Sequence, residues 1–221
     1  MMNNLNWSEI HTVFLDMDGT LLDLHFDNYF WREHVPQHYA KYKHISLEVA
    51  KEQFYAECKA VEGTLNWYCV DFWTEKLGLD IALLKEEVAH LIAEHPFVIE
   101  FLDAVKKTQR PIILVTNAHQ KSIDLKMRNT AFGEYLDQVI SSHDLGFPKE
   151  TLEFWHKLQI IYPFELAHTL LIDDSLSVLN AAREYGFQHL LVVRNPDTKQ
   201  PPRNLDDFDV LESFAQIIPN K

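Results

Sequence analysis

The chain has 221 residues, which is enough for one or two domains with a hydrophobic core that needs no disulfide or structural metal. Its 20 Lys and Arg residues face 33 Asp and Glu residues, a formal net charge of −13, which excludes a general role in binding nucleic acid or an anionic membrane surface. Hydrophobic residues make up 47% and charged residues 24% of the chain, as in a folded rather than a disordered protein.

The N-terminal segment MMNNLNWSEI has neither the basic nor the apolar region of a secretory signal peptide. No apolar run reaches the roughly 18 residues that cross a bilayer. The two cysteines, Cys58 and Cys69, match no disulfide framework and no zinc site. We therefore expect a cytoplasmic protein with no membrane partner, while the sequence identifies no protein partner.

Short apolar runs with β-branched residues predict five buried strands. They are Thr12–Asp16, Pro111–Thr116, Gln138–Ser141, Thr169–Asp173 and Gln188–Arg194. Helical patterns fill most gaps after the second run, at Gln120–Met127, Glu150–Ile161 and Leu176–Tyr185. Strands that alternate with helices predict an α/β fold with an open, Rossmann-like parallel sheet. In such sheets the ligand binds beyond the carboxyl ends of the strands.

The segment between the first two strands, about residues 24–96, shows almost no strand pattern. Ser46, Thr64 and Asp80 look like the N-caps of three helices. We predict that residues 24–96 form a helical cap domain over the carboxyl edge of the sheet. Residues 1–23 and 97–221 would then form the α/β core domain. Near its end the core would have a Pro-rich polar loop, Asn195–Asn204, and a short helix around Leu211–Ile217.

Two pairs of carboxylates follow predicted strands. Asp16 ends the first predicted strand and Asp18 lies two residues later, and Asp173 and Asp174 come at the end of the fourth. Carboxylates that converge at strand ends repel one another unless a cation lies among them. Mg²⁺ prefers such hard oxygen ligands and keeps its other positions for water and phosphate oxygens. The sequence therefore predicts a magnesium site at this edge of the sheet.

Two further polar positions belong to the same rim. Thr116 and Asn117 end the second strand, where a hydroxyl and the backbone N–H groups of the next helix favour an anion. Lys149 follows Gly146-Phe147-Pro148 and places a cation between the third strand and the next helix. Taken singly, a Thr-Asn pair is more typical of a helix cap, and a loop lysine of a solvated surface charge.

Together these four motifs, in this order, resemble those of the haloacid dehalogenase (HAD) superfamily of phosphohydrolases. They read DMDGT (Asp16–Thr20), VTN (Val115–Asn117), GFPK (Gly146–Lys149) and IDDS (Ile172–Ser175). The resemblance implies a HAD-type core with an inserted C1-type helical cap, Mg²⁺ as cofactor and an aspartyl-phosphate intermediate. The dehalogenases of the superfamily carry Tyr where this chain has Asp18 and use no metal, so dehalogenation is not expected.

The resemblance also implies a role for each motif residue. Asp16 would be the nucleophile and Asp18 the general acid/base. Thr116 and Lys149 would bind the phosphoryl group, and Asn117 would be a further substrate-binding residue. The magnesium ligands would be the Asp16 carboxylate, the Asp18 backbone carbonyl and Asp174, with Asp173 bound directly or through water.

A finer resemblance links the chain to the bacterial GMP/IMP-type 5′-nucleotidases. It rests on LLDLHFDNYFW (Leu21–Trp31), TLNWYCVDFW (Thr64–Trp73), TNAH (Thr116–His119) and NPD (Asn195–Asp197). It implies a small phosphomonoester substrate, a purine nucleoside 5′-monophosphate. Asp27 and Asn28 are candidate hydrogen-bonding partners of that substrate. Some of the aromatic residues of the cap would line the base pocket, and the others would form the core of a helical bundle.

Two other functions remain open. A sugar-phosphate phosphatase or phosphomutase would share the same core and motifs. A phospho-accepting signalling domain, like the receivers of response regulators, also combines an acidic pair, an acceptor Asp, a Thr and a Lys. Receivers lack a 73-residue insertion and place the acidic pair before the acceptor, whereas Asp173 and Asp174 come last here.

Overall fold

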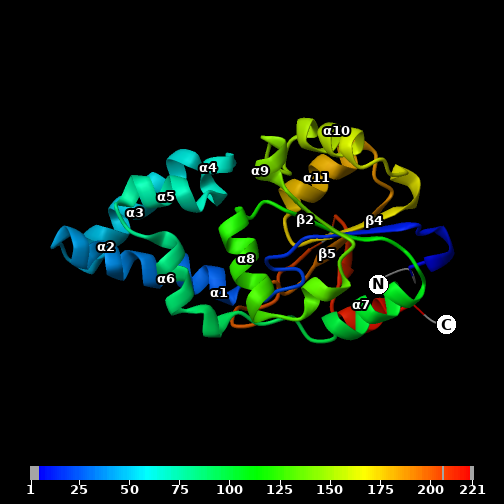
Figure 1. The fold of residues 1–221 in the computed structure, drawn as a ribbon, viewed down its shortest axis with the longest axis horizontal. Coiled ribbons are helices and arrows are strands. Elements are labelled where there is room, and N and C mark those ends of the chain that lie inside the picture. The colour runs from blue at the N-terminus through cyan, green and yellow to red at the C-terminus, as the bar shows by residue number, and fades with distance from the viewer. Residues whose placement is uncertain (1–4, 206, 220–221) are drawn as a thin grey trace.

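The computed structural model describes residues 5–205 and 207–219, which contain a six-stranded sheet in the order β3-β2-β1-β4-β5-β6 (Figure 1). The strands are β1 (Thr12–Leu15), β2 (Ile112–Thr116), β3 (Gln138–Ser141), β4 (Thr169–Asp173), β5 (His189–Val193) and β6 (Asp209–Leu211). All pairings between these neighbours are parallel. The predicted α/β fold with an open parallel sheet is confirmed.

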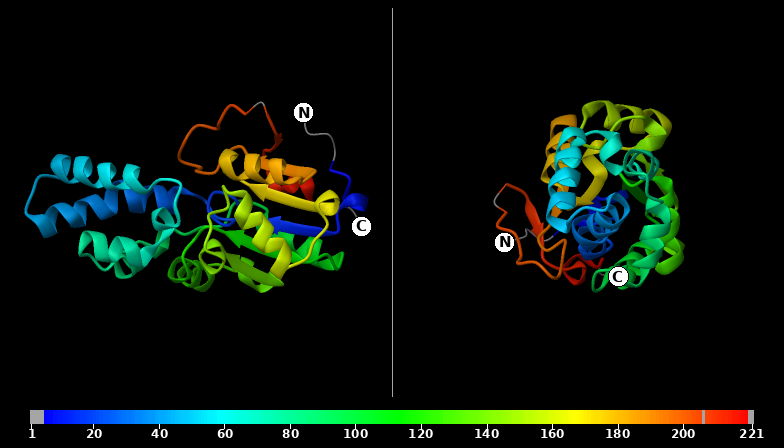
Figure 2. Two further views of the ribbon diagram at one scale, coloured as in Figure 1. Left: turned by 90° about the horizontal axis from the view of Figure 1, so that it is seen from above. Right: turned by 90° about the vertical axis from the view of Figure 1, so that its left-hand side faces the viewer.

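Helices cover both faces of the sheet, which explains why its central strands are apolar along their whole length (Figure 2). One face packs against α7 (Val98–Lys107). The other packs against α10 (Leu152–Ile161) and α11 (Leu176–Tyr185). Successive residues of a strand point to opposite faces, so the neighbours Phe14 and Leu15 lie in different cores.

The predicted strands lie within one residue of the observed ones, but the C-terminal part differs from expectation. β6 is not among the predicted strands, because it is only three residues long and begins at the exposed Asp209. The predicted helix around Leu211–Ile217 is wrong at its start. Leu211 ends β6, and only Phe214–Ile217 form a 3₁₀ turn, η6, which the Ser213 side chain caps.

The three helices predicted after the second strand are present with shifts of at most two residues, as α8 (Gln120–Asn129), α10 and α11. The core also contains the short helix α9 (Ser142–Leu145) and the 3₁₀ turns η1 (Trp7–Glu9), η4 (Phe132–Tyr135) and η5 (Leu166–His168). The helix predicted from Glu150 begins at Leu152 instead, so Lys149 and Glu150 lie in the turn before α10. That turn brings both side chains to the edge of the sheet.

Residues 24–96, called the helical insert below, form helices and 3₁₀ or π-helical turns. They are α1 (His25–Tyr29), η2 (Phe30–His34), α2 (Val35–Lys43), α3 (Leu47–Val61), α4 (Leu65–Tyr68), α5 (Val70–Leu77), α6 (Ile81–Glu87) and η3 (Ala89–Leu91). The insert has a core of its own around Phe30, Phe54 and Trp73, and it occupies one end of the molecule (Figures 1 and 2). The division into two domains at these boundaries stays a prediction.

Two of the three predicted caps of the insert make capping hydrogen bonds, whereas Thr64 precedes α4 without one. Ser46 accepts a hydrogen bond from the Val49 N–H and starts α3, and Asp80 accepts one from the Leu83 N–H and starts α6. The single helix expected after Thr64 is two helices, α4 and α5. Cys69 adopts an extended backbone between them, and its sulfur caps α5 by accepting from the Phe72 N–H.

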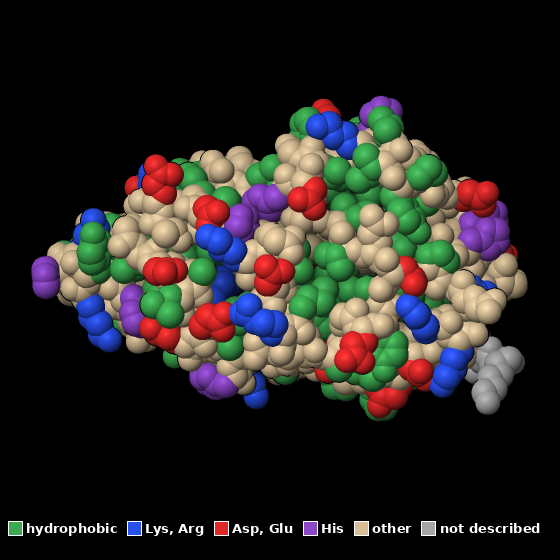
Figure 3. Space-filling view, in the orientation of Figure 1, with side chains coloured by type: hydrophobic (Ala, Val, Ile, Leu, Met, Phe, Trp, Pro, Cys, Tyr) green, Lys and Arg blue, Asp and Glu red, His purple; other side chains and the backbone are tan. Residues whose placement is uncertain are grey.

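The surface carries both signs of charge. On the face that Figure 3 shows, acidic and basic side chains are interspersed, and no extended basic patch is present. Among the residues that the structure describes, no helix is both long and apolar enough to cross a membrane. The two cysteines are not disulfide-bonded.

Candidate active site

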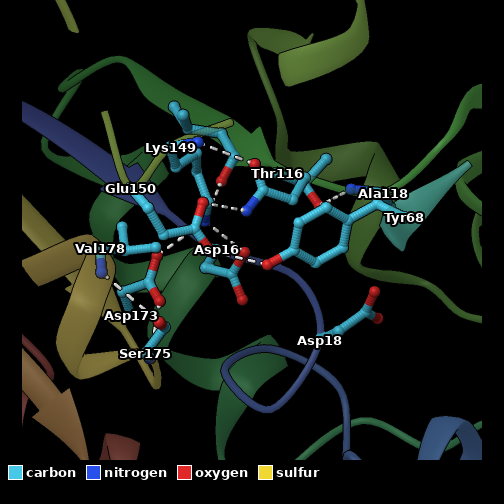
Figure 4. A network of polar contacts seen from close by, with 12 residues as sticks. Asp16, Asp18, Tyr68, Thr116, Ala118, Lys149, Glu150, Asp173, Ser175 and Val178 are labelled. Carbon is cyan, nitrogen blue, oxygen red and sulfur yellow. Dashed lines mark hydrogen bonds and ion pairs between the residues drawn. The ribbon is translucent and has the colours of Figure 1, made fainter. Parts of the chain in front are cut away.

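Three strand ends bring Asp16, Thr116 and Asp173 to one edge of the sheet (Figure 4). β1 lies between β2 and β4, so the chain leaves β1 first to one side of the sheet and later continues on the other. Such a switch point opens a crevice at the carboxyl ends of the strands. Asp16, Asp173 and Asp174 each place an oxygen within 4.8 Å of the others there.

Lys149 joins two of these carboxylates. Its ammonium donates to Asp16 Oδ1 at 2.6 Å, to Asp173 Oδ2 at 2.7 Å and to the carbonyl of Val115 at 3.0 Å. The Lys149 backbone is also fixed, because its N–H donates to Asn117 Oδ1 and its carbonyl accepts from Trp155 Nε1. The side chain is only 2% exposed. Lys149 is therefore a rigid, buried cation and not a solvated surface charge.

Burial and the closeness of like charges shift the pKa values of the three carboxylates. Burial raises the pKa of Asp16 to about 6, with Lys149 opposing the shift and Asp173 adding to it. Burial also raises the pKa of Asp173, and burial together with the charges of Asp173 and Asp16 raises the pKa of Asp174 well above its usual value. Burial would lower the pKa of Lys149, but Asp16 and Asp173 outweigh it and raise that pKa. Lys149 is hydrogen-bonded to two of these three carboxylates, and Arg203 opposes the rise of the Asp174 pKa, so a further cation would balance the remaining negative charge.

Asp18 lines the same rim but pairs with a different lysine. Its Oδ1 accepts a hydrogen bond from Lys126 Nζ at 2.5 Å, and Figure 4 shows it apart from the network around Lys149. Burial raises the pKa of Asp18 to about 6, against the opposing effect of Lys126. Asp18 therefore has an environment of its own, as two carboxylates with different chemical roles require.

Thr116 and Asn117 lie where β2 ends. Thr116 is 1% exposed, and its hydroxyl oxygen accepts from the Ala118 N–H at 3.0 Å, which leaves the hydroxyl hydrogen to donate. Asn117 accepts from the Lys149 N–H and donates through Nδ2 to Glu150 Oε2 at 3.0 Å. The Asn117 side chain thus supports the turn that carries Lys149, and its contact with a substrate stays a prediction.

A cavity of about 510 Å³ extends from these polar residues to the helical insert. Asp16, Asp18 and Lys149 line it beside the sheet, and Trp31 and Trp67 line it on the insert. Small-molecule sites have volumes in this range and combine apolar walls with a few polar groups. The arrangement suits a ligand with one anionic and one aromatic end.

Asp27 and Asn28, predicted to contact the substrate, also line this cavity but already have partners. Asp27 accepts from Lys126 at 2.6 Å and from Lys85 at 3.0 Å. Burial alone would raise the pKa of Asp27, but the charges of these two lysines outweigh burial and lower that pKa to about 2. Asn28 Nδ2 donates to Asp197 Oδ2 at 2.7 Å. Contact of either residue with a substrate stays a prediction.

Two residues of the site, Lys126 and Glu150, could not be recognised from the sequence. Lys126 has the sequence context of an ordinary helix lysine, and the one sign of its burial is that it lies three residues after Ile123, on the same buried face of α8. Glu150 accepts from Tyr68 Oη at 2.6 Å and so connects the insert to the turn of Lys149. Neither contact has a local sequence pattern, because each joins residues more than 80 positions apart.

The chain is similar in sequence to known proteins. The chain matches the family model of haloacid dehalogenase-like hydrolases over residues 10–186. It is 37% identical over 217 residues to the GMP/IMP nucleotidase YrfG of Escherichia coli (strain K12), and the match covers 98% of each chain. The sequence similarity therefore includes the helical insert as well as the sheet.

Solved structures share the fold. A HAD phosphatase from Thermococcus onnurineus superposes with a TM-score of 0.76 at 21% identity, over 94% of this chain and 95% of that one. The HAD-hydrolase YfnB of Bacillus subtilis, bound to magnesium, superposes with a TM-score of 0.65 at 19% identity, over 94% and 96% of the two chains.

We predict that Lys149→Met destabilises the fold, because it leaves Asp16 and Asp173 buried without their shared cation. Breaking a buried ion pair in this way costs about 3 kcal/mol or more. Urea denaturation in metal-free buffer measures the free energy of unfolding. Lys107→Met is the control, because it removes an exposed pair with Asp103 and should change that energy by less than about 1 kcal/mol. Equal, small effects of both substitutions would contradict the role of Lys149.

Proposed function

Because the chain belongs to the haloacid dehalogenase-like hydrolases and is a phosphatase, we propose that it dephosphorylates purine nucleoside 5′-monophosphates, GMP and IMP above all. The observation that carries the proposal is the cavity that joins the Asp16 carboxylate to the aromatic side of the insert. The 37% identity to a GMP/IMP nucleotidase, which extends over the insert, supports the same substrate class.

The aromatic residues of the insert differ in burial. Phe30 is fully buried in its core, and Trp73 is only 1% exposed there although it also borders the cavity. Trp31, Tyr55 and Trp67 are less buried and line the cavity. Because every nucleobase has a π-face, such rings are suited to stack on a purine whose 5′-phosphate lies at Asp16.

In the proposed reaction Asp16 attacks the phosphorus and forms an aspartyl-phosphate, as carboxylate nucleophiles do. Lys149, 2.6 Å from Asp16 Oδ1, and the Thr116 hydroxyl bind the phosphoryl oxygens. Asp18 protonates the leaving 5′-oxygen, then takes a proton from the water that hydrolyses the aspartyl-phosphate. The phosphate and the nucleoside leave, and Asp16 and Asp18 return to their starting states.

The free oxygens of the site fit Mg²⁺. Among the described residues no side chain donates to Asp16 Oδ2 or to either carboxylate oxygen of Asp174. Both oxygens of Asp173 are engaged, Oδ1 by the Ser175 N–H at 2.8 Å and Oδ2 by Lys149. We therefore assign Asp16, Asp174 and the Asp18 carbonyl as direct ligands, and Asp173 as the residue that holds Lys149 or binds through water. Bound Mg²⁺ would neutralise charge on the phosphoryl oxygens.

Gly19 shapes this metal site. Its φ of +85° is unfavourable for other residues, and an added Cβ would lie 2.8 Å from Asp174 Cγ and 2.9 Å from Asp174 Oδ2. The loop after β1 therefore reaches Asp174 only with glycine at this position.

The proposed binding partner is a small phosphomonoester and neither a nucleic acid nor a membrane, in keeping with the net charge of −13. We place the enzyme in the cytoplasm, and the absence of a disulfide between Cys58 and Cys69 agrees with a reducing compartment.

We predict that a screen of nucleotides, sugar phosphates and flavin mononucleotide gives kcat/KM values for GMP and IMP about tenfold or more above the others. EDTA should abolish turnover, and added Mg²⁺ should restore it. A flat profile would overturn the purine assignment and leave the phosphatase assignment intact. Return of the phosphoryl group to a sugar phosphate, seen by product analysis, would identify a mutase instead.

We further predict that Gly19→Ala weakens Mg²⁺ binding about tenfold or more, because the new methyl group displaces Asp174. Isothermal titration calorimetry with Mg²⁺ alone measures this directly. Gly63→Ala is the matched control, since Gly63 has a φ of +77° but no atom within 4 Å of its added Cβ. Unchanged magnesium affinity in Gly19→Ala would contradict Asp174 as a ligand.

A further inference from the structure

A second buried group of charges lies beside the first, formed by Asp18, Lys126, Asp27 and Lys85. Lys126 Nζ donates to Asp18 Oδ1 at 2.5 Å and to Asp27 Oδ2 at 2.6 Å, and Lys85 Nζ donates to Asp27 Oδ1 at 3.0 Å. The side chains of Lys126 and Lys85 are 2% and 4% exposed. Negative and positive charges alternate along this row, so the four groups balance one another.

Separate parts of the fold hold this row together. Lys126 comes from α8, Lys85 from α6 and Asp27 from α1, and α8 packs against α6. The ring of Phe26 lies 5.2 Å from Lys126 Nζ and 5.0 Å from Lys85 Nζ, within the range of cation–π attraction. Because the two ammonium groups are almost fully buried, their ion pairs are stronger and better defined in geometry than pairs at the surface.

The contact with Lys126 makes the two oxygens of Asp18 unequal. Oδ1 is held by the ammonium, whereas Oδ2 receives no hydrogen bond from a side chain in the described part of the chain. Asp18 lines the cavity and Lys126 does not, so Lys126 acts on a bound ligand only through Asp18. A general acid must be held within hydrogen-bond reach of the atom that it protonates.

We propose that Lys126 is a positioning residue for Asp18: it fixes Oδ1, so that Oδ2 carries the proton in both steps of the reaction. Asp27, held by Lys85, keeps Lys126 in place. In the first step the Oδ2 proton passes to the 5′-oxygen as its bond to phosphorus breaks. In the second step Oδ2 takes a proton from the water that attacks the aspartyl-phosphate. This inference rests on the proposed function, in which Asp18 is the general acid/base.

The test compares two leaving groups in Lys126→Met. The value of kcat/KM reports the steps up to the departure of the leaving group. The nucleoside oxygen of GMP needs a proton to leave, whereas nitrophenolate leaves p-nitrophenyl phosphate without one. We expect kcat/KM to fall about 10²-fold for GMP, the lower end of general-acid effects, and less than about tenfold for p-nitrophenyl phosphate.

An equal fall for both substrates would overturn the proposal, because a purely structural role affects both leaving groups alike. Lys121→Met on the same helix is the matched control. Lys121 is exposed and pairs with Asp71, outside the cavity. This variant should leave both kcat/KM values within about twofold of wild type, as surface substitutions away from a site usually do.

Lys126→Met removes the cation between Asp18 and Asp27, and the repulsion between these two carboxylates could prevent folding. A second set of variants covers that case. Asp27→Asn removes one of these charges, and the double variant Lys126→Met/Asp27→Asn is compared with Asp27→Asn alone. A selective loss with GMP in the double variant supports the proposal, and an equal loss with both substrates overturns it.

The leaving-group comparison can test the role of Lys126 even if the proposed purine substrate is wrong. A wild-type enzyme that hydrolyses p-nitrophenyl phosphate but no purine nucleotide would overturn the proposed function. The leaving-group comparison would then use a sugar phosphate that the enzyme does hydrolyse, since its oxygen also needs a proton to leave. A selective loss there would still support Lys126, and an equal loss would overturn it.

Discussion

The contact of Lys149 with Asp16 and Asp173 is the interaction on which the site depends. It joins the ends of β1 and β4 to the turn before α10, and it also holds the carbonyl of Val115 on β2. This geometry requires the parallel sheet, because only adjacent parallel strands bring both carboxylates to one edge. It also leaves the site with more negative than positive charge, which explains why its free oxygens suit a divalent cation.

The acidic composition of the chain is compatible with an anionic substrate for the same reason. The net charge of −13 is a sum over the whole chain, whereas Lys149 and the proposed magnesium would make the electrostatic potential at Asp16 locally more positive. Asp18 has its own lysine, Lys126, and the two carboxylates therefore need not share one environment. Separate environments for a nucleophile and an acid/base are what a two-step phosphoryl transfer demands.

The parts that sequence could predict are those with local signals. The five longer strands follow from apolar runs, the caps at Ser46 and Asp80 from residue type, and the motif residues from their places at strand ends. The three-residue β6 and the break at Cys69 lack a periodic pattern. The burial of Lys126 could not be predicted, because it depends on Asp18 and Asp27 about a hundred residues earlier in the chain.

In the proposed reaction Asp16 carries the phosphoryl group as an aspartyl-phosphate. Borohydride trapping detects this intermediate: the enzyme is mixed with GMP and Mg²⁺, quenched and reduced, which converts an aspartyl-phosphate into homoserine. Peptide mass spectrometry should then find homoserine at position 16 and at no other aspartate. Turnover of GMP without this modification, together with undiminished turnover by Asp16→Asn, would contradict the account.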